Sequence, residues 1–328
     1  MSVQFVKNAV SPYGQAPSDE KQALQLIEVC GRTAYKSEDK ITEGSAQKFV
    51  LMLKGHGHLS VLEHSNVVLR IEPDSGAQSD PLDSILRALK DRLGFHRIFE
   101  MEQGVFLAGN FRAWLETIEF LKQSGSDLYG FFADSLNRHF PNLFEAPRAA
   151  SASAPMKASL VREQDQMNLL KENEAADLPV FVFRFVCDRG ITHEVVRHRV
   201  FSFTQESTRY VNYKNKGMVL ILPEELYPFY NDATGDFSED APLVREWRNR
   251  AELIFDWYKS DLARGLRPEI ARDILPNLLK SEIFVSGRWS GWKHFIRLRD
   301  SGQAHPRIRF IAKEVRNYFE GLGLVCRD

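Results

Sequence analysis

Apolar positions recur with helical spacing in two early segments and form short continuous runs in two others. Residues 19–31 and 45–54 carry apolar side chains three and four positions apart, which predicts a helix in each. Residues 66–71 form a short apolar run that predicts a strand, and VFVFRFVC at 180–187 is typical of a buried strand. The chain therefore combines helices with at least two strands.

The stretch between the two strands has two parts of different character. Residues 81–93 and 115–140 have helical apolar spacing, which predicts a folded, helical part over 81–145. From 147 to 177 the sequence turns to Ala, Ser and Pro and then to charged residues. This composition predicts a mobile linker with a short helix at most.

Composition narrows the class of protein. At 328 residues, with 43% hydrophobic residues and 23 Phe, the chain can bury a sizeable core in one large domain or two smaller ones. A net charge of −1 argues against general affinity for nucleic acid or membranes. Cys30, Cys187 and Cys326 are too few and too scattered for a disulfide framework or a zinc site with paired cysteines. No run approaches the roughly 18 apolar residues of a membrane span, so we expect a cytoplasmic protein, neither exported nor inserted.

The segment RHRVFSFTQESTRY at 197–210 holds three arginines, a histidine and two serines. Guanidinium groups bind phosphate through paired charge-assisted hydrogen bonds, and serine hydroxyls add neutral donors. A solvated basic face has the same composition, but the buried strand just upstream favours a phosphate or oxyanion site. If 190–201 is a helix, Glu194, Arg197 and His198 share one face, and Ser207 and Arg209 point the same way if their backbone is extended.

The same region nearly matches the zinc-protease motif H-E-x-x-H. In HEVVRH at 193–198 the second histidine comes one residue late, which puts the two rings roughly 140° apart on a helix. We therefore expect no metal site.

The pattern R-H-R-x-x-S-x(4)-S-x-R in 197–209 resembles the signature of the flavin-dependent thymidylate synthases. Four further segments resemble blocks of that family in order: RTAYKS at 32–37, GHLSVLEH at 57–64, EIARDILP at 269–276 and WKHFIRLR at 292–299. The resemblance covers roughly 20–71 and 180–320.

The resemblance implies an α/β (α+β) fold with a central mixed or antiparallel sheet flanked by helices. It assigns 1–71 and 180–328 to the synthase domain and makes 72–179 a mainly helical insertion, because in the family the two strands almost adjoin. It also implies a homotetramer whose sites draw residues from more than one subunit.

The implied activity is the reductive methylation of dUMP to dTMP. The chain has no cysteine nucleophile in a recognisable setting, no G-x-G-x-x-G loop and no Walker motif, so a bound flavin must carry the redox chemistry. By resemblance that flavin is FAD, NADPH reduces it and methylenetetrahydrofolate donates the carbon.

The resemblance also implies the site residues. Arg299 is the expected catalytic residue, facing the uracil ring and favouring ionisation at N3; the alternative is a surface arginine on the helix of Phe295 and Leu298. The expected dUMP-binding residues are Glu194, Arg197, Gln205, Ser207, Arg209, Arg272 and Arg299. The expected FAD-binding residues are His58, Ser60, Glu63, Arg197, His198, Arg199, Gln205, Arg288, Ser290 and His294. Without the resemblance, Ser60 and Glu63 would start a helix as a capping box.

Two departures from the family pattern leave alternatives open. Gln205 stands where many members have Glu, and Arg288 and Ser290 stand where an Asn-x-Arg pair is common. An internal repeat aligns 108–114 with 286–292, and its first copy keeps Asn110 and Arg112. Asn110 either caps a helix or, with Arg112, lends flavin contacts that the second copy has lost.

Two other functions fit the pattern less well. One is flavin-dependent C5 methylation of another pyrimidine nucleotide, such as UMP. The other is a nucleic-acid-binding module that reads phosphates with the Arg-His-Arg cluster and has no catalytic role.

Overall fold

A computed structural model describes residues 3–73, 83, 85, 89, 96–102, 104–146 and 156–325. Its α-helices are α1 (Glu20–Tyr35), α2 (Ser45–Gly55), α4 (Phe111–Gln123), α5 (Leu128–His139), α6 (Glu163–Glu172), α7 (Arg189–Val195), α8 (Tyr213–Lys216), α9 (Pro242–Ala263), α10 (Pro268–Ala271), α11 (Trp289–Arg299) and α12 (Pro306–Gly321). Its 3-10 helices are η1 (Glu38–Lys40), η2 (Leu59–His64), η4 (Glu224–Phe229) and η5 (Arg272–Ile274). Its strands are β1 (Gln4–Val6), β2 (Ala9–Gln15), β3 (Val67–Pro73), β4 (Arg97–Met101), β5 (Gly104–Gly109), β6 (Met156–Leu160), β7 (Val180–Asp188), β8 (Ser202–Gln205), β9 (Val219–Ile221), β10 (Tyr230–Asn231), β11 (Asp236–Phe237) and β12 (Lys280–Arg288).

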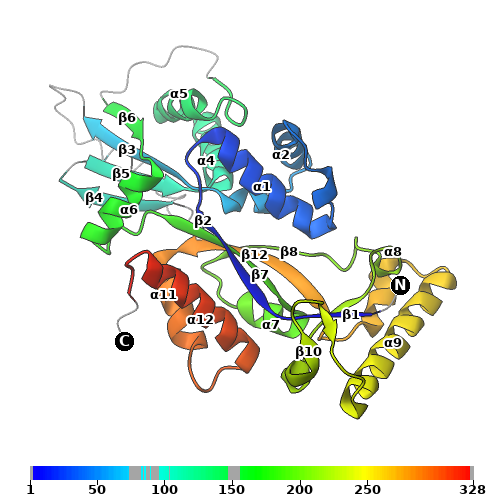
Figure 1. Ribbon diagram of the computed structural model, residues 1–328. Coiled ribbons are helices and arrows are strands. Elements are labelled where there is room, and N and C mark those ends of the chain that lie inside the picture. The colour runs from blue at the N-terminus through cyan, green and yellow to red at the C-terminus, as the bar shows by residue number, and fades with distance from the viewer. Residues whose placement is uncertain are drawn as a thin grey trace.

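One four-stranded antiparallel sheet carries the signature segment, in the order β2-β7-β12-β8. Side chains alternate along β7, so Phe181, Phe183 and Phe185 pack with α11 and α12, whereas Val182 packs with α1. Figure 1 shows these helices on opposite sides of the sheet. Because both faces are covered, the strand reads as a continuous apolar run, and the buried strand predicted at 180–187 is confirmed.

A second four-stranded antiparallel sheet has the order β4-β5-β3-β6. Its core is shared with α1, α2, α4 and α5 (Figure 1). The α+β class is therefore confirmed. Both early helices are confirmed as α1 and α2, and Asp19 caps α1 by accepting a hydrogen bond from the Gln22 amide.

The two sheets repeat one strand-to-helix corner. The first corner along the chain joins β5 to α4. Gly109 ends β5 opposite Val67, and the Trp114 indole N–H of α4 donates to the Val67 carbonyl at 3.3 Å. In the second, Gly287 near the end of β12 pairs with Phe181, and the Trp292 indole of α11 lies 3.4 Å from the Phe181 carbonyl.

A ring from the neighbouring chain segment closes each corner. It is His96 before β4 and Phe201 before β8, with ring centroids 4.6 Å from Trp114 and 4.3 Å from Trp292. A Cβ on Gly109 or Gly287 would overlap that ring, so glycine is required at both places. The internal repeat predicted from the sequence is thus also a repeat of structure.

The region between β3 and β7 departs from its predicted helices and linker. The helix predicted over 115–140 is two helices, α4 and α5, and three unpredicted strands, β4, β5 and β6, lie among helices that still predominate. Of 81–93, positions 83, 85 and 89 are helical, and the rest lie outside the described residues.

The predicted mobile linker is wrong at 156–160, because β6 pairs with β3 there, whereas α6 is the short helix that the prediction allowed. Residues 147–155 lie outside the described residues. Since β3 pairs with both β5 and β6, the segment predicted as an insertion shares a sheet with 67–73. The division into a synthase domain and an insertion stays a prediction.

Candidate active site

Arg299, at the end of α11, contacts two residues of the signature region. Its Nη1 donates to Glu194 Oε2 at 2.8 Å and its Nη2 to the Glu194 carbonyl at 3.3 Å, while Nε donates to His198 Nε2 at 3.0 Å. The helix predicted over 190–201 is wrong in its second half, because α7 ends at Val195 and the chain then turns. That turn nevertheless brings Glu194 and His198 to the same guanidinium group.

The charge state of His198 follows from its surroundings. Burial, with the nearby positive charges of Arg299, His294 and Arg197, lowers the pKa of His198 to about 4. The imidazole is therefore neutral at pH 7. Because Nε2 accepts from Arg299, the proton belongs on Nδ1. Arg299 is thus held by one carboxylate and one neutral acceptor, and its side chain is 15% exposed.

A pocket of about 410 Å³ lies where the two repeated corners meet. Five of the predicted flavin residues line it, together with Asn110 and Arg97 from the first corner. The five are Glu63, Arg199, Arg288, Ser290 and His294. Two buried polar atoms of lining residues, Asn66 Oδ1 and His96 Nδ1, have no protein partner among the described residues.

Contacts across this pocket join the two halves of the chain. Glu63 accepts from Arg112 Nη1 at 2.8 Å and from the Ser202 hydroxyl at 2.9 Å. Asn110 caps α4, its amide oxygen accepting from the Ala113 backbone N–H at 2.8 Å. The capping role is therefore confirmed, and it leaves the Asn110 amide N–H groups for another partner.

The Arg288 side chain donates hydrogen bonds to backbone carbonyls. Its Nη1 donates to the carbonyls of Asp177 and Leu178, and burial lowers the pKa of Arg288 to about 10, opposed by Asp177. The guanidinium stays charged at neutral pH, but part of its donor capacity is used within the protein.

The second half of the signature follows β8. Gln205 Nε2 donates to the hydroxyls of Thr192 and Ser281 at 2.9 and 3.0 Å, contacts that the carboxylate of Glu could not make as a donor. Arg272 Nη1 donates to the Thr208 hydroxyl at 3.1 Å, which brings 269–276 against this segment. Arg209 lies in a turn that begins after Ser207, whose carbonyl accepts from the Tyr210 N–H, so the two residues do not share the continuous extended backbone that was expected.

Comparisons with known proteins agree on one family. The model of the family described as thymidylate synthase complementing protein (Thy1) matches residues 161–322. The flavin-dependent thymidylate synthase of Pyrococcus abyssi is 34% identical over 128 residues, covering 38% of this chain and 48% of its own length. That of Mycolicibacterium gilvum is 39% identical over 132 residues, covering 38% and 51%. Residues 161–322, just under half of the chain, are therefore similar to this family.

The likeness to these synthases is partial. The chain spans about half the length of the curated relatives it matches. A solved structure of the UMP/dUMP methylase PolB from Streptomyces cacaoi, bound with 5-Br dUMP, is 23% identical with a TM-score of 0.37, covering 48% of this chain and 74% of that one.

Some of the predicted site residues lie neither among the contacts of Arg299 nor in the pocket where the two repeated corners meet. His58 and Ser60 are exposed at the start of η2, which begins at Leu59, so Ser60 is not the predicted N-cap. Arg197 is exposed in the turn after α7. None of these three lines the pocket. Their role as ligand contacts stays a prediction.

The signature segment is also held by ion pairs and hydrogen bonds to residues that the sequence did not single out. Glu206 is buried and pairs with Lys280 at 3.1 Å and Lys36 at 3.5 Å, and it accepts from the Tyr213 hydroxyl at 2.9 Å. The Ser207 N–H donates to the Ala34 carbonyl at 3.0 Å. A charged residue following a strand is the one signal that could have marked Glu206.

Within the described ranges, no cluster of three or more His, Cys, Asp or Glu is arranged to hold a metal ion. Over the same ranges, no helix is long and apolar enough to cross a membrane. Cys30 and Cys187 are buried free thiols, and burial raises the pKa of each.

Proposed function

We propose that this protein is a flavin-dependent thymidylate synthase that methylates dUMP to dTMP with FAD, methylenetetrahydrofolate and NADPH. The observation that carries the proposal is the fixed guanidinium of Arg299, held by Glu194 and His198. A positive charge oriented in advance stabilises a developing anion without reorganisation at the moment of reaction. Beside a uracil ring, it would favour the ionised N3 that makes C5 nucleophilic.

The pocket between the repeated corners fits part of a flavin dinucleotide. Arg199, Arg288 and Arg97 supply positive charge for phosphates, and Asn66 Oδ1 and His96 Nδ1 are unpartnered buried atoms for neutral hydrogen bonds. Bound flavin would supply the hydride that completes the methyl group. The protein's part is to bind, orient and exclude water.

Five of the seven predicted dUMP residues fall into two groups in one chain, which supports a shared site. Arg299 and Glu194 form one group, while Ser207, Arg209 and Arg272 form the other beyond β8. We infer that one copy provides the catalytic arginine and another the phosphate-binding group, in a homotetramer. Buried free thiols fit the reducing cytoplasm.

Tritium release from 5-labelled dUMP tests the activity. With FAD, NADPH and methylenetetrahydrofolate, the wild-type protein should release tritium and form dTMP, and Arg299→Ala should not. Purified protein should be yellow with flavin absorption bands. Absence of both flavin and tritium release from the wild type would refute the proposal.

A flavin-dependent methylation of UMP is the second candidate. Gln205 favours it, because its two amide N–H groups donate to Thr192 and Ser281 and leave a neutral carbonyl oxygen for the ligand, where Glu would present a charged carboxylate. Comparing kcat/KM for dUMP and UMP decides between the substrates. The nucleic-acid-binding alternative requires steeply salt-dependent binding and no bound flavin.

A further inference from the structure

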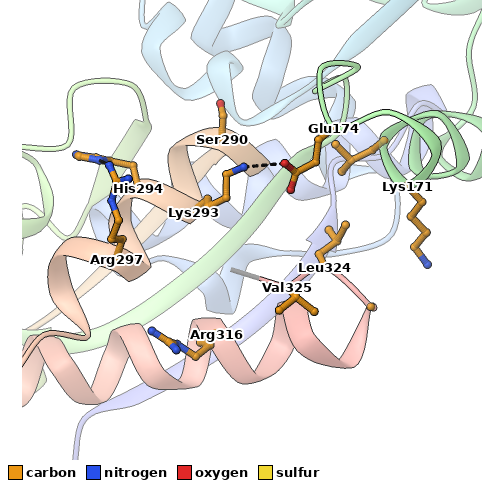
Figure 2. A pocket seen from close by; sticks show the side chains of 11 residues that line it. Lys171, Glu174, Ser290, Lys293, His294, Arg297, Arg316, Leu324 and Val325 are labelled. Atoms are coloured by element: carbon orange, nitrogen blue, oxygen red, sulfur yellow. Dashed lines mark hydrogen bonds and ion pairs between the residues drawn. The ribbon is translucent and has the colours of Figure 1, made fainter. Parts of the chain in front are cut away.

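A second cavity, of about 810 Å³, adjoins the 410 Å³ pocket between the repeated corners, which we call the flavin pocket after its proposed ligand. The two share Ser290 and His294. Figure 2 shows it between α11, the end of α12 near Leu324, and the segment that follows α6. A cavity of several hundred Å³ is in the range of small-molecule sites. None of the predicted dUMP residues lines it.

Positive charge predominates in this cavity, which we call the basic pocket. One carboxylate, that of Glu174, faces four cationic lining residues: Lys171, Lys293, Arg297 and Arg316. Lys293 Nζ pairs with Glu174 at 2.9 Å, so that charge is neutralised locally.

The remaining cations differ in their partners. Arg316 pairs with Asp300 at 2.9 Å. Arg297 Nη2 lies 3.3 Å from His294 Nδ1, and neither Arg297 nor Lys171 has a carboxylate partner among the described residues. These two exposed side chains leave a positive excess inside the basic pocket.

The cations do not converge on one point. Lys171 and Arg297 stand on opposite sides of the basic pocket in Figure 2. Apolar Leu170, Leu324 and Val325 also line it. A single phosphate would reach one or two of these charges, whereas a long ligand with several separated anionic groups would reach most of them.

We propose that the basic pocket binds the polyanionic extension of a co-substrate whose reactive end lies in the flavin pocket beside Ser290 and His294. The proposal rests on the proposed function. The ligand chemistry is a flexible arm with several carboxylates or phosphates. Within the proposed reaction it has two sources, the glutamyl tail of a folate and the phosphates of a pyridine nucleotide.

The test is a binding comparison on the full-length flavoprotein. Titration calorimetry measures Kd for tetraglutamyl against monoglutamyl tetrahydrofolate, and for NADP+ against NAD+. The variant Lys171→Ala/Arg297→Ala removes the two unpaired cations from exposed positions. Lys122→Ala/Lys313→Ala is the matched control, since it removes two exposed lysines, one on α4 and one on α12, neither of which lines the basic pocket.

We expect the more anionic ligand of one pair to bind wild type tighter, and the pocket variant to lose about five-fold of that advantage, the effect of removing two exposed ion pairs. The Kd of the less anionic ligand should be the same for wild type and the pocket variant. The control variant should have the wild-type Kd for every ligand. The pair that responds identifies the source. Equal Kd values in wild type and pocket variant for all four ligands would overturn the proposal. Failure of wild type to form dTMP would refute the proposed function while leaving these Kd comparisons intact.

Discussion

His64 should make the stability of this protein sensitive to mild acid. The side chain is fully buried between two hydroxyls, with Nδ1 2.5 Å from Ser286 Oγ and Nε2 2.9 Å from Thr204 Oγ1. Burial lowers the pKa of His64 to about 3 in the folded protein. The unfolded chain restores a pKa of about 6.5.

Whether acid raises or lowers the free energy of unfolding depends on which state, folded or unfolded, binds the proton at His64. Below pH 6.5 the unfolded chain takes up a proton at His64 and the folded protein does not, so acid favours unfolding. This contribution to stability is complete above pH 6.5 and is lost as the pH falls toward 3. Between pH 7 and 5, one such histidine accounts for about 2 kcal/mol of the free energy of unfolding.

The variant His64→Gln isolates this effect. Gln cannot titrate, so its free energy of unfolding should fall by about 2 kcal/mol less than that of wild type between pH 7 and 5. At pH 7 the variant should be less stable by about 1–3 kcal/mol, because two buried hydroxyls lose well-placed partners. Urea unfolding followed by tryptophan fluorescence at both pH values measures each quantity.

A matched control separates burial from histidine content. His56→Gln changes an exposed histidine just after α2 and should leave the wild-type pH dependence in place. If His64→Gln and wild type lose the same stability between pH 7 and 5, the buried neutral imidazole is refuted.

Three further changes test the site and its scaffold. Arg299→Lys keeps a positive charge but loses the forked donors, and kcat for tritium release should drop about 100-fold or more, with flavin content unchanged. Gly287→Ala should lower the free energy of unfolding by about 1–3 kcal/mol through overlap with Phe201, whereas Gly55→Ala, which points into open space, should not; equal melting temperatures would contradict this. Asn110→Ala with Arg112→Ala should lower flavin occupancy in the purified protein, and unchanged occupancy would leave Asn110 a helix cap alone.

Elements with a strong local pattern could be predicted from the sequence. Strand β7 is a continuous apolar run because both of its faces are covered, and α1 begins at the capping residue Asp19. The Gly109 and Gly287 corners were visible as spaced Gly and Trp residues. In each case the local sequence and the tertiary structure agree.

Elements held by distant partners could not be predicted in the same way. Strand β8 has four residues and pairs with β12, far along the chain, after α7 has ended at Val195. Strand β6, in a segment whose Ala, Ser and Pro give no alternating strand pattern, is ordered by pairing with β3. Nothing within either segment marks its partner.

The same limit applies to the site. Family resemblance named Arg299, Glu194 and His198 separately, but their convergence on one guanidinium depends on how α7 and α11 pack. The Glu206–Lys280 pair was missed, because two charged residues distant in sequence give no sign that they share a buried position.

The repeated corner explains where the two copies were free to diverge. Gly109 and Gly287 are fixed by a ring packed against the backbone, so the turn from strand to helix is constrained in both copies. The residue that follows each glycine is not constrained by that ring. Asn110 caps its helix with a side-chain oxygen, whereas Arg288 caps nothing and instead donates to two carbonyls. An arginine committed to backbone in this way cannot replace an asparagine amide at a ligand. If flavin binding needs that amide, the first copy is the one that can supply it, because Asn110 and Arg288 line the same pocket.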